Sequence, residues 1–177
     1  VVVMHQMGSH GPAYFKRSAA ALKKFQPECT STNLQECTQA QVVNAYDNSI
    51  VQTDQFLDSV LNWLSDQSDK AQTAMIYVAD HGESLGENNI YLHGLPYSIA
   101  PDVQKHVPWI TWLSPAMQAR THVTTGCLQQ DVAQRRVTHD NYFHSVLGLM
   151  DVQTGAYSPA LDMFAGCRQQ PNGPLAG

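Results

Sequence analysis

Imidazole and carboxylate side chains gather in three short, glycine-containing motifs of this sequence. Asp80 and His81 are adjacent in one motif, and His93 follows twelve residues after His81 in another. A third motif, with the letters GSHGP, carries His10. Nitrogen and carboxylate oxygen are the ligands that zinc takes where thiolates are absent, and bound zinc polarises a phosphoryl oxygen or activates an attacking hydroxyl. We therefore expect Asp80 and His81 to bind zinc, with His10 and His93 beside them.

The elements around these motifs predict an α/β fold. Residues 1–6 and residues 73–79 are continuous apolar runs, typical of strands buried on both faces of a parallel sheet. Between them, Thr38 and Gln41 have the spacing of a capping box, and apolar residues then repeat every three or four positions as far as Leu64. This order of strand, helix and strand is a βαβ unit, whose two strands run parallel.

Parallel strands place their carboxyl ends at one edge of the sheet, where α/β proteins bind ligands. We therefore expect His10 to be a neighbour of Asp80 and His81. A long polar loop leads to a third predicted strand at residues 107–113, and Thr138 begins a predicted helix that runs to about Met150. An Asp-His pair after a strand also serves as a surface turn or a helix cap, but three such motifs at predicted strand ends favour a metal site.

Length and charge exclude several classes of protein. The chain has 177 residues, enough for one domain with a hydrophobic core, and its formal net charge is −5. Nucleic-acid binders that neutralise phosphates have the opposite charge balance. No apolar run approaches the roughly 20 residues of a membrane-spanning helix. Because the sequence opens on an apolar strand, we expect residues 1–177 to be the later part of a larger domain. We also expect the protein to be a monomer.

Four cysteines indicate the compartment. Cys29 and Cys37 enclose a short polar loop, and Cys127 and Cys167 flank the last helical segment. Two disulfides in an oxidising compartment are the simplest interpretation, with proximity in the sequence favouring the pairs 29–37 and 127–167. Free thiols remain the alternative, and the spacings do not match a thiolate zinc site.

The motifs together resemble the catalytic domain of the phosphoethanolamine–lipid A transferases, most closely their mobile colistin-resistance type, within the alkaline phosphatase/sulfatase superfamily. The resemblance covers roughly residues 1–115. The segments that carry it are GSHGP at residues 8–12, YDN at 46–48, DHGESLGEN at 80–88, YLHGLPY at 91–97, Ala100-Pro101, Gln104 and Val107-Pro108.

This resemblance implies an α/β/α sandwich with a mainly parallel sheet, and a zinc-dependent transfer of phosphoethanolamine from phosphatidylethanolamine to lipid A that confers polymyxin resistance. It implies that Asp80 and His81 bind the catalytic zinc, and that His10 and His93 contact the phosphoryl group or a second zinc. It also implies the Cys29–Cys37 disulfide and a place at the periplasmic face of the bacterial inner membrane. The family's nucleophilic threonine and its membrane domain match no segment of this chain, so we expect these 177 residues alone to be inactive.

Two other functions are compatible with the same residues. A sulfatase-like or phosphatase-like hydrolase would use the same metal site but pass the group to water. A non-catalytic secreted α/β binding domain would hold its histidines in turns and would gain no stability from zinc.

Overall fold

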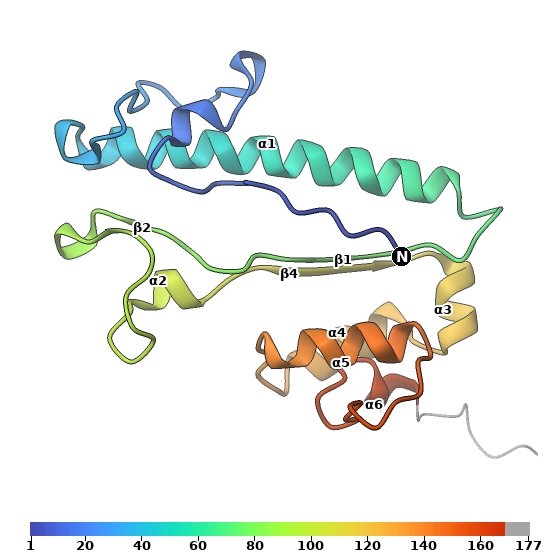
Figure 1. The fold of residues 1–177 in the computed structure, drawn as a ribbon. Coiled ribbons are helices and arrows are strands. Elements are labelled where there is room, and N and C mark those ends of the chain that lie inside the picture. Colours follow the sequence, from blue (N-terminus) through green and yellow to red (C-terminus); the bar gives the residue numbers. More distant parts are fainter. Residues whose placement is uncertain (169–177) are drawn as a thin grey trace, which may run out of the picture. The chain divides into compact units, whose positions relative to one another are not determined.

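The protein is described here by a computed structural model of residues 1–168, which form two compact units (Figure 1). The first unit comprises Val1–Trp63 and Ile76–Ile110, and the second comprises Leu64–Met75 and the chain from Thr111 onward. The regular elements, in chain order, are 3-10 helices at Tyr14–Lys16, Ala20–Leu22 and Leu34–Glu36, helix α1 (Gln39–Asp66), strands β1 (Ala74–Val78) and β2 (Ser84–Leu85), a 3-10 helix at Glu87–Asn89, strand β3 (Tyr91–Leu92), helix α2 (Asp102–Lys105), strand β4 (Trp109–Leu113), and helices α3 (Pro115–Thr121), α4 (Thr125–Val132), α5 (Asp140–Leu149) and α6 (Ala165–Arg168). None of the helices within residues 1–168 has the length and apolar character that a membrane span requires.

Helix α1 begins at the predicted capping box. The backbone N–H of Thr38 donates to Gln41 Oε1 at 2.9 Å, and the N–H of Gln41 donates to Thr38 Oγ1 at 3.3 Å. These two bonds satisfy donors that the first turn of a helix leaves unpaired. The helix ends at Asp66, close to the predicted end, and it buries Val42 and Ala45 on one face.

The predicted strands at residues 73–79 and 107–113 are confirmed as β1 and β4, which pair with each other. The N–H of Ala79 donates to the Pro108 carbonyl in the first unit, and the N–H of Ser114 donates to the Thr73 carbonyl in the second. These bonds join the end of one strand to the start of the other, so β1 and β4 run in opposite directions. The long loop predicted before β4 instead contains α2 and an antiparallel hairpin of β2 and β3.

The prediction of a strand at residues 1–6 was wrong. The segment is extended in Figure 1 but has no strand pairing, and Val1, Val2 and Val3 are 90%, 83% and 85% exposed. An apolar run becomes a strand only where a neighbouring backbone pairs with it. The parallel pairing expected between this segment and β1 is therefore not seen among residues 1–168.

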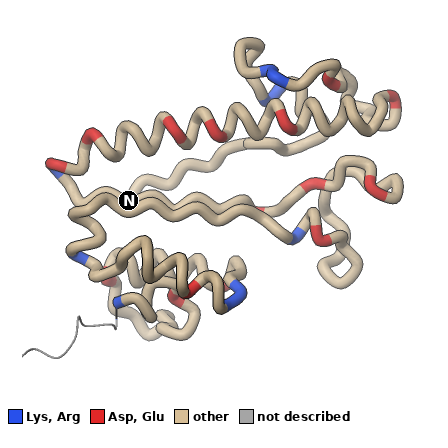
Figure 2. Tube along the Cα trace, turned by 180° about the vertical axis from the view of Figure 1, so that it is seen from behind, with Lys and Arg blue, Asp and Glu red and all other residues tan. Residues whose placement is uncertain are grey.

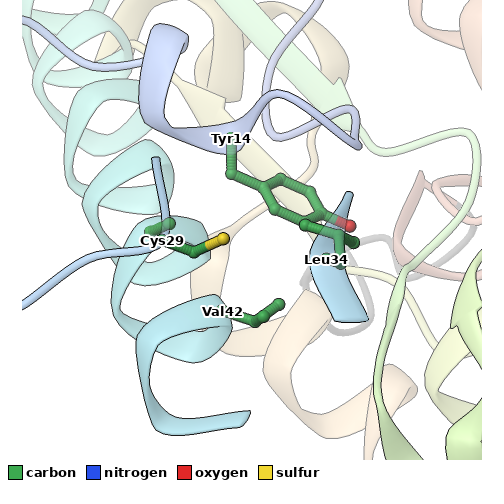
Figure 3. Close-up of a cluster of buried hydrophobic side chains, with 5 residues drawn as sticks. Tyr14, Cys29, Leu34 and Val42 are labelled. Carbon is green, nitrogen blue, oxygen red and sulfur yellow. The ribbon is translucent and has the colours of Figure 1, made fainter. Parts of the chain in front are cut away.

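The core of the first unit lies between α1 and the loop that precedes it. Its buried members are Tyr14, Cys29, Leu34, Val42 and Ala45 (Figure 3). A disulfide joins Cys29 to Cys37, as the sequence favoured, and closes the loop against this core.

The second unit contains helices α3 to α6, and its buried side chains include Met117, Val123, Leu149 and Phe164. A disulfide joins Cys127 on α4 to Cys167 on α6, again as favoured. The carboxylate of Asp162, which is 1% exposed, pairs with the guanidinium of Arg168 and accepts a hydrogen bond of 2.7 Å from the hydroxyl of Tyr157. These contacts fasten the last described helix to its unit.

Candidate metal centre

Three histidines converge in the first unit. One ring nitrogen each from His10, His81 and His93 lies within 4.8 Å of the others, and all three side chains are half-buried. The rings of His81 and His93 are stacked with centroids 3.7 Å apart, and the His10 ring meets the His93 ring edge-on at 4.8 Å. They come from three separate segments: the turn after residue 8, the end of β1 and the end of β3. We call these three residues the histidine cluster.

Hydrogen bonds to the backbone determine which ring nitrogen of His10 and of His81 carries the hydrogen. His10 Nδ1 lies 2.7 Å from the Gly11 carbonyl oxygen, and His81 Nδ1 lies 3.0 Å from the Gly82 carbonyl oxygen. A carbonyl oxygen only accepts, so each Nδ1 carries the hydrogen and each Nε2 of a neutral ring keeps its lone pair. Imidazoles that bind metals are held in this way by their second nitrogen.

A buried carboxylate anchors the Nδ1 atom of the third histidine, His93. The Glu83 side chain is 4% exposed, and its Oε1 lies 3.2 Å from His93 Nδ1. The same carboxylate accepts hydrogen bonds from the N–H of Gly11 and the hydroxyl of Tyr14, both at 3.1 Å. Burial, and then the nearby charge of Glu83, raises the pKa of Tyr14 well above its usual range, so Tyr14 stays a neutral donor. Glu83 thereby ties the segment of His10 to the segment of His93.

The role of Glu83 was not predicted from the sequence. Its partners Gly11 and Tyr14 are 72 and 69 residues away in the chain, so no local pattern shows the contact. The available signal was a carboxylate two residues after His81 in a strand-end motif.

Gly82 allows α2 to approach the end of β1. A Cβ atom at this position would overlap the carbonyl oxygen of Val103, and the N–H of Gly82 donates to the Gln104 carbonyl at 3.0 Å. The side chain of Gln104 is buried and donates to Ser84 Oγ at 2.8 Å. The two bonds brace the segment that holds His81, which explains why a glycine follows this histidine.

The backbone around His93 is unusual. Leu92 has a φ of 64°, in the left-handed region that a branched side chain rarely adopts, and Gly94 follows with a φ of 101°. Leu92 packs against the core of the first unit, and a Cβ atom on Gly11 would overlap its side chain. Packing therefore holds Leu92 in this conformation, which aims His93 at the cluster.

Asp80 lies beside the cluster but is not one of its three converging groups. Its side chain is 78% exposed, its Oδ1 accepts the N–H of His81, and its Oδ2 lies 3.8 Å from His81 Nε2. Two ligands at about 2.1 Å from one zinc ion lie at most about 4.2 Å apart, so this pair has the spacing of two ligands of one ion.

The chemistry of these donors fits zinc. The site offers imidazole nitrogens with free lone pairs, an adjacent carboxylate and second nitrogens already anchored, and no thiolate, since all four cysteines are in disulfides. The remaining histidines, at positions 5, 106, 122, 139 and 144, do not join this group.

Comparison with known families identifies the architecture. The sulfatase family matches residues 1–152. The chain belongs to the sulfatase family. The alkaline phosphatase/sulfatase-like α/β fold expected from the sequence is thus confirmed, and residues 1–168 represent part of this sulfatase fold.

Within the sulfatase family, the chain is similar to solved structures and curated proteins that are named as phosphoethanolamine or phosphatidylethanolamine transferases. The soluble domain of lipooligosaccharide phosphoethanolamine transferase A from Neisseria meningitidis matches with a TM-score of 0.89 and 43% identity, covering 94% of this chain and 50% of that one. Phosphoethanolamine transferase EptA of Salmonella typhimurium is 47% identical over 169 residues, which is 96% of this chain and 31% of EptA. Phosphatidylethanolamine transferase Mcr-1 of Escherichia coli is 41% identical over 152 residues, covering 86% of this chain and 26% of Mcr-1.

The predicted resemblance to the phosphoethanolamine transferases is therefore confirmed. This sulfatase-family chain spans less than a third of the length of the curated relatives named here.

Proposed function

We propose that this chain is the zinc-binding part of a phosphoethanolamine transferase that moves phosphoethanolamine from phosphatidylethanolamine to lipid A. The observation that carries the proposal is the histidine cluster, with its second ring nitrogens anchored by two carbonyls and by the buried Glu83. The similarity to named phosphoethanolamine transferases over most of the chain supports the choice of substrate.

We assign each residue of the site a role in zinc binding or in contact with the phosphoryl group. Asp80 and His81 hold the catalytic zinc, and His10 and His93 contact the phosphoryl group or hold a second zinc. Zinc, when bound, supplies a Lewis acid that stabilises charge on the phosphoryl oxygens. Glu83 keeps His93 in one orientation and one tautomer, so that its Nε2 faces the reacting group rather than rotating away.

The transfer proceeds in two displacements at phosphorus. A threonine hydroxyl, supplied by a segment outside these 177 residues, attacks the phosphodiester of the donor, and the bond to diacylglycerol breaks as that oxygen takes a proton. An oxygen of a lipid A phosphate then attacks the phosphorus, and the bond to the threonine breaks as the threonine oxygen takes a proton. Covalent capture divides one difficult transfer into two easier steps.

We propose that this chain acts in the periplasm at the inner membrane, and the two disulfides and the lipid substrates support this compartment. The parent protein would attach there through a membrane domain that is not part of these 177 residues. The crystal structure of a periplasmic domain of EptC from Campylobacter jejuni, 38% identical with a TM-score of 0.80, supports this compartment. Phosphoethanolamine on lipid A masks negative charge, so we expect the parent protein to raise resistance to cationic polymyxins such as colistin.

The test is product analysis with the full-length protein. Incubation with phosphatidylethanolamine and lipid A should give phosphoethanolamine-modified lipid A by mass spectrometry, and His93→Ala should reduce the yield at least about a hundredfold. His106→Ala, which removes an exposed histidine outside the cluster, is the matched control. Release of free phosphoethanolamine without modified lipid A would instead identify a hydrolase.

A further inference from the structure

A hollow of ≈ 280 Å³ lies in the first unit, next to the turn that carries His10. Its lining includes the cationic residues Lys16 and Arg17 and the polar residues Gln52 and Thr53. Its volume is close to the lower limit of small-molecule sites, roughly 300 Å³. None of these lining residues belongs to the histidine cluster.

The hollow is positive in a unit that is otherwise acidic. Every Lys and Arg of the first unit except Lys105 lies between residues 16 and 24, although the unit contains more Asp and Glu than Lys and Arg. Figure 2 shows this group of cations in blue on the segment that precedes α1. Lys23 is used within its own loop, because its Nζ pairs with Glu28 Oε1 at 2.5 Å. Lys16 and Arg17 are the two cations of this segment that line the hollow.

Arg17 links the hollow to the histidine cluster. Its Nε donates to the carbonyl oxygen of His10 at 3.1 Å, which holds the guanidinium next to the turn of that histidine. This bond uses one donor of the guanidinium, and the terminal nitrogens of its fork are suited to phosphate oxygens. A phosphate bound in the hollow would therefore lie beside the cluster without occupying it.

We propose that this hollow binds a phosphomonoester group of the acceptor lipid. The inference rests on the proposed function. The charge of the phosphate group indicates which of the two lipid substrates the hollow binds. A phosphomonoester carries a charge of about −1.5 to −2 near pH 7, which two cations match, whereas the phosphodiester of the donor carries a single charge.

The experiment measures both lipid substrates separately with the full-length protein. Lys16→Gln, and the double variant Lys16→Gln/Arg17→Gln, are compared with Lys24→Gln, which removes an exposed charge of the same segment outside the hollow. Steady-state rates with lipid A give the acceptor KM, and diacylglycerol released from phosphatidylethanolamine without acceptor reports the donor step. The double variant should raise the acceptor KM at least about tenfold, since it loses charged hydrogen bonds, and Lys16→Gln alone should leave the donor step unchanged.

Lys16→Gln alone, at an exposed residue, should raise the acceptor KM in the same direction, and Lys16→Arg should restore it. An unchanged acceptor KM, a rise in the donor KM alone, or an equal effect of Lys24→Gln would overturn the proposed subsite. A wild-type protein that releases no diacylglycerol would instead refute the proposed function itself, so the two failures are distinguishable.

Discussion

His93 Nδ1 and Glu83 Oε1 lie 3.2 Å apart, and the carboxylate that makes this contact is almost completely buried. Within residues 1–168, the hydrogen bonds of Glu83 come from Gly11, Tyr14 and His93, and none comes from a lysine or an arginine. A buried carboxylate is costly unless its oxygens are paired, so all three contacts are needed to keep it there. The orientation of His93 is therefore tied to the core of the first unit.

Replacing Glu83 with Gln should weaken zinc binding by about 10–100-fold. The amide keeps the shape of the side chain but has one acceptor oxygen in place of two, so Gly11, Tyr14 and His93 cannot all be satisfied. Competition with a chromophoric chelator measures the affinity. Glu36→Gln removes a carboxylate elsewhere in the same unit and should leave zinc affinity unchanged; an equal loss in both variants would argue against a positioning role for Glu83.

Gly82→Ala should destabilise the protein strongly, because the new Cβ would overlap the Val103 carbonyl and push α2 away from the end of β1. We expect a loss of about 2–4 kcal/mol in the free energy of unfolding by urea denaturation. Gly126→Ala is the contrasting variant: it lies in α4 with open space around it, and should stabilise by about 0.5–1 kcal/mol. Equal effects of the two substitutions would contradict the close approach at Gly82.

The disulfide that closes the longer loop should contribute more to stability. Cys29 and Cys37 are 8 residues apart, and Cys127 and Cys167 are 40 residues apart. Loop-closure entropy predicts a loss of about 2.5 kcal/mol for the double Ser variant of the first pair and about 4 kcal/mol for that of the second. Denaturation of each double variant checks this order, and a larger loss at the shorter loop would show that packing of Cys29 in the core outweighs chain entropy.

The protein should lose stability above pH 10. Burial, followed by the charge of Glu83, raises the pKa of Tyr14 and Tyr46 above the ordinary value of 10.0. Below that pH both the folded and the unfolded chain keep these protons; above it only the unfolded chain releases them, so the free energy of unfolding falls as pH rises. Tyr14→Phe should make this fall less steep, by up to about 1.4 kcal/mol per pH unit. Tyr97→Phe, at a residue that is 72% exposed, is the control. Identical slopes for the wild type and Tyr14→Phe would contradict the assignment.

Local features of the fold could be predicted from the sequence. The start of α1 depends on Thr38 and Gln41, which are three residues apart, and the strands β1 and β4 on short apolar runs. The two-residue strands β2 and β3 were missed because a period cannot be recognised over so few residues. The strand at residues 1–6 failed for the opposite reason: its pattern is clear, but a strand also needs a partner backbone.

The meeting of His10 with His81 was predicted from the shared edge of two parallel strands, and the structure brings them together by another route. The Glu83 carboxylate binds Gly11 and His93 at once, and this joins segments more than seventy residues apart in the chain. Contacts of such sequence separation leave no local pattern. The zinc role of Asp80 stays a prediction, since its exposed carboxylate lies next to His81 but outside the histidine cluster.

Metal content is the most direct test of the central claim that the histidine cluster binds zinc. Plasma mass spectrometry would compare the purified wild-type chain with His81→Ala/His93→Ala and with His5→Ala/His106→Ala, a control that removes two exposed histidines outside the cluster. We predict about one zinc ion per chain in the wild type and the control, and less than about a tenth of that in the cluster variant. Equal zinc content in all three proteins would contradict the account.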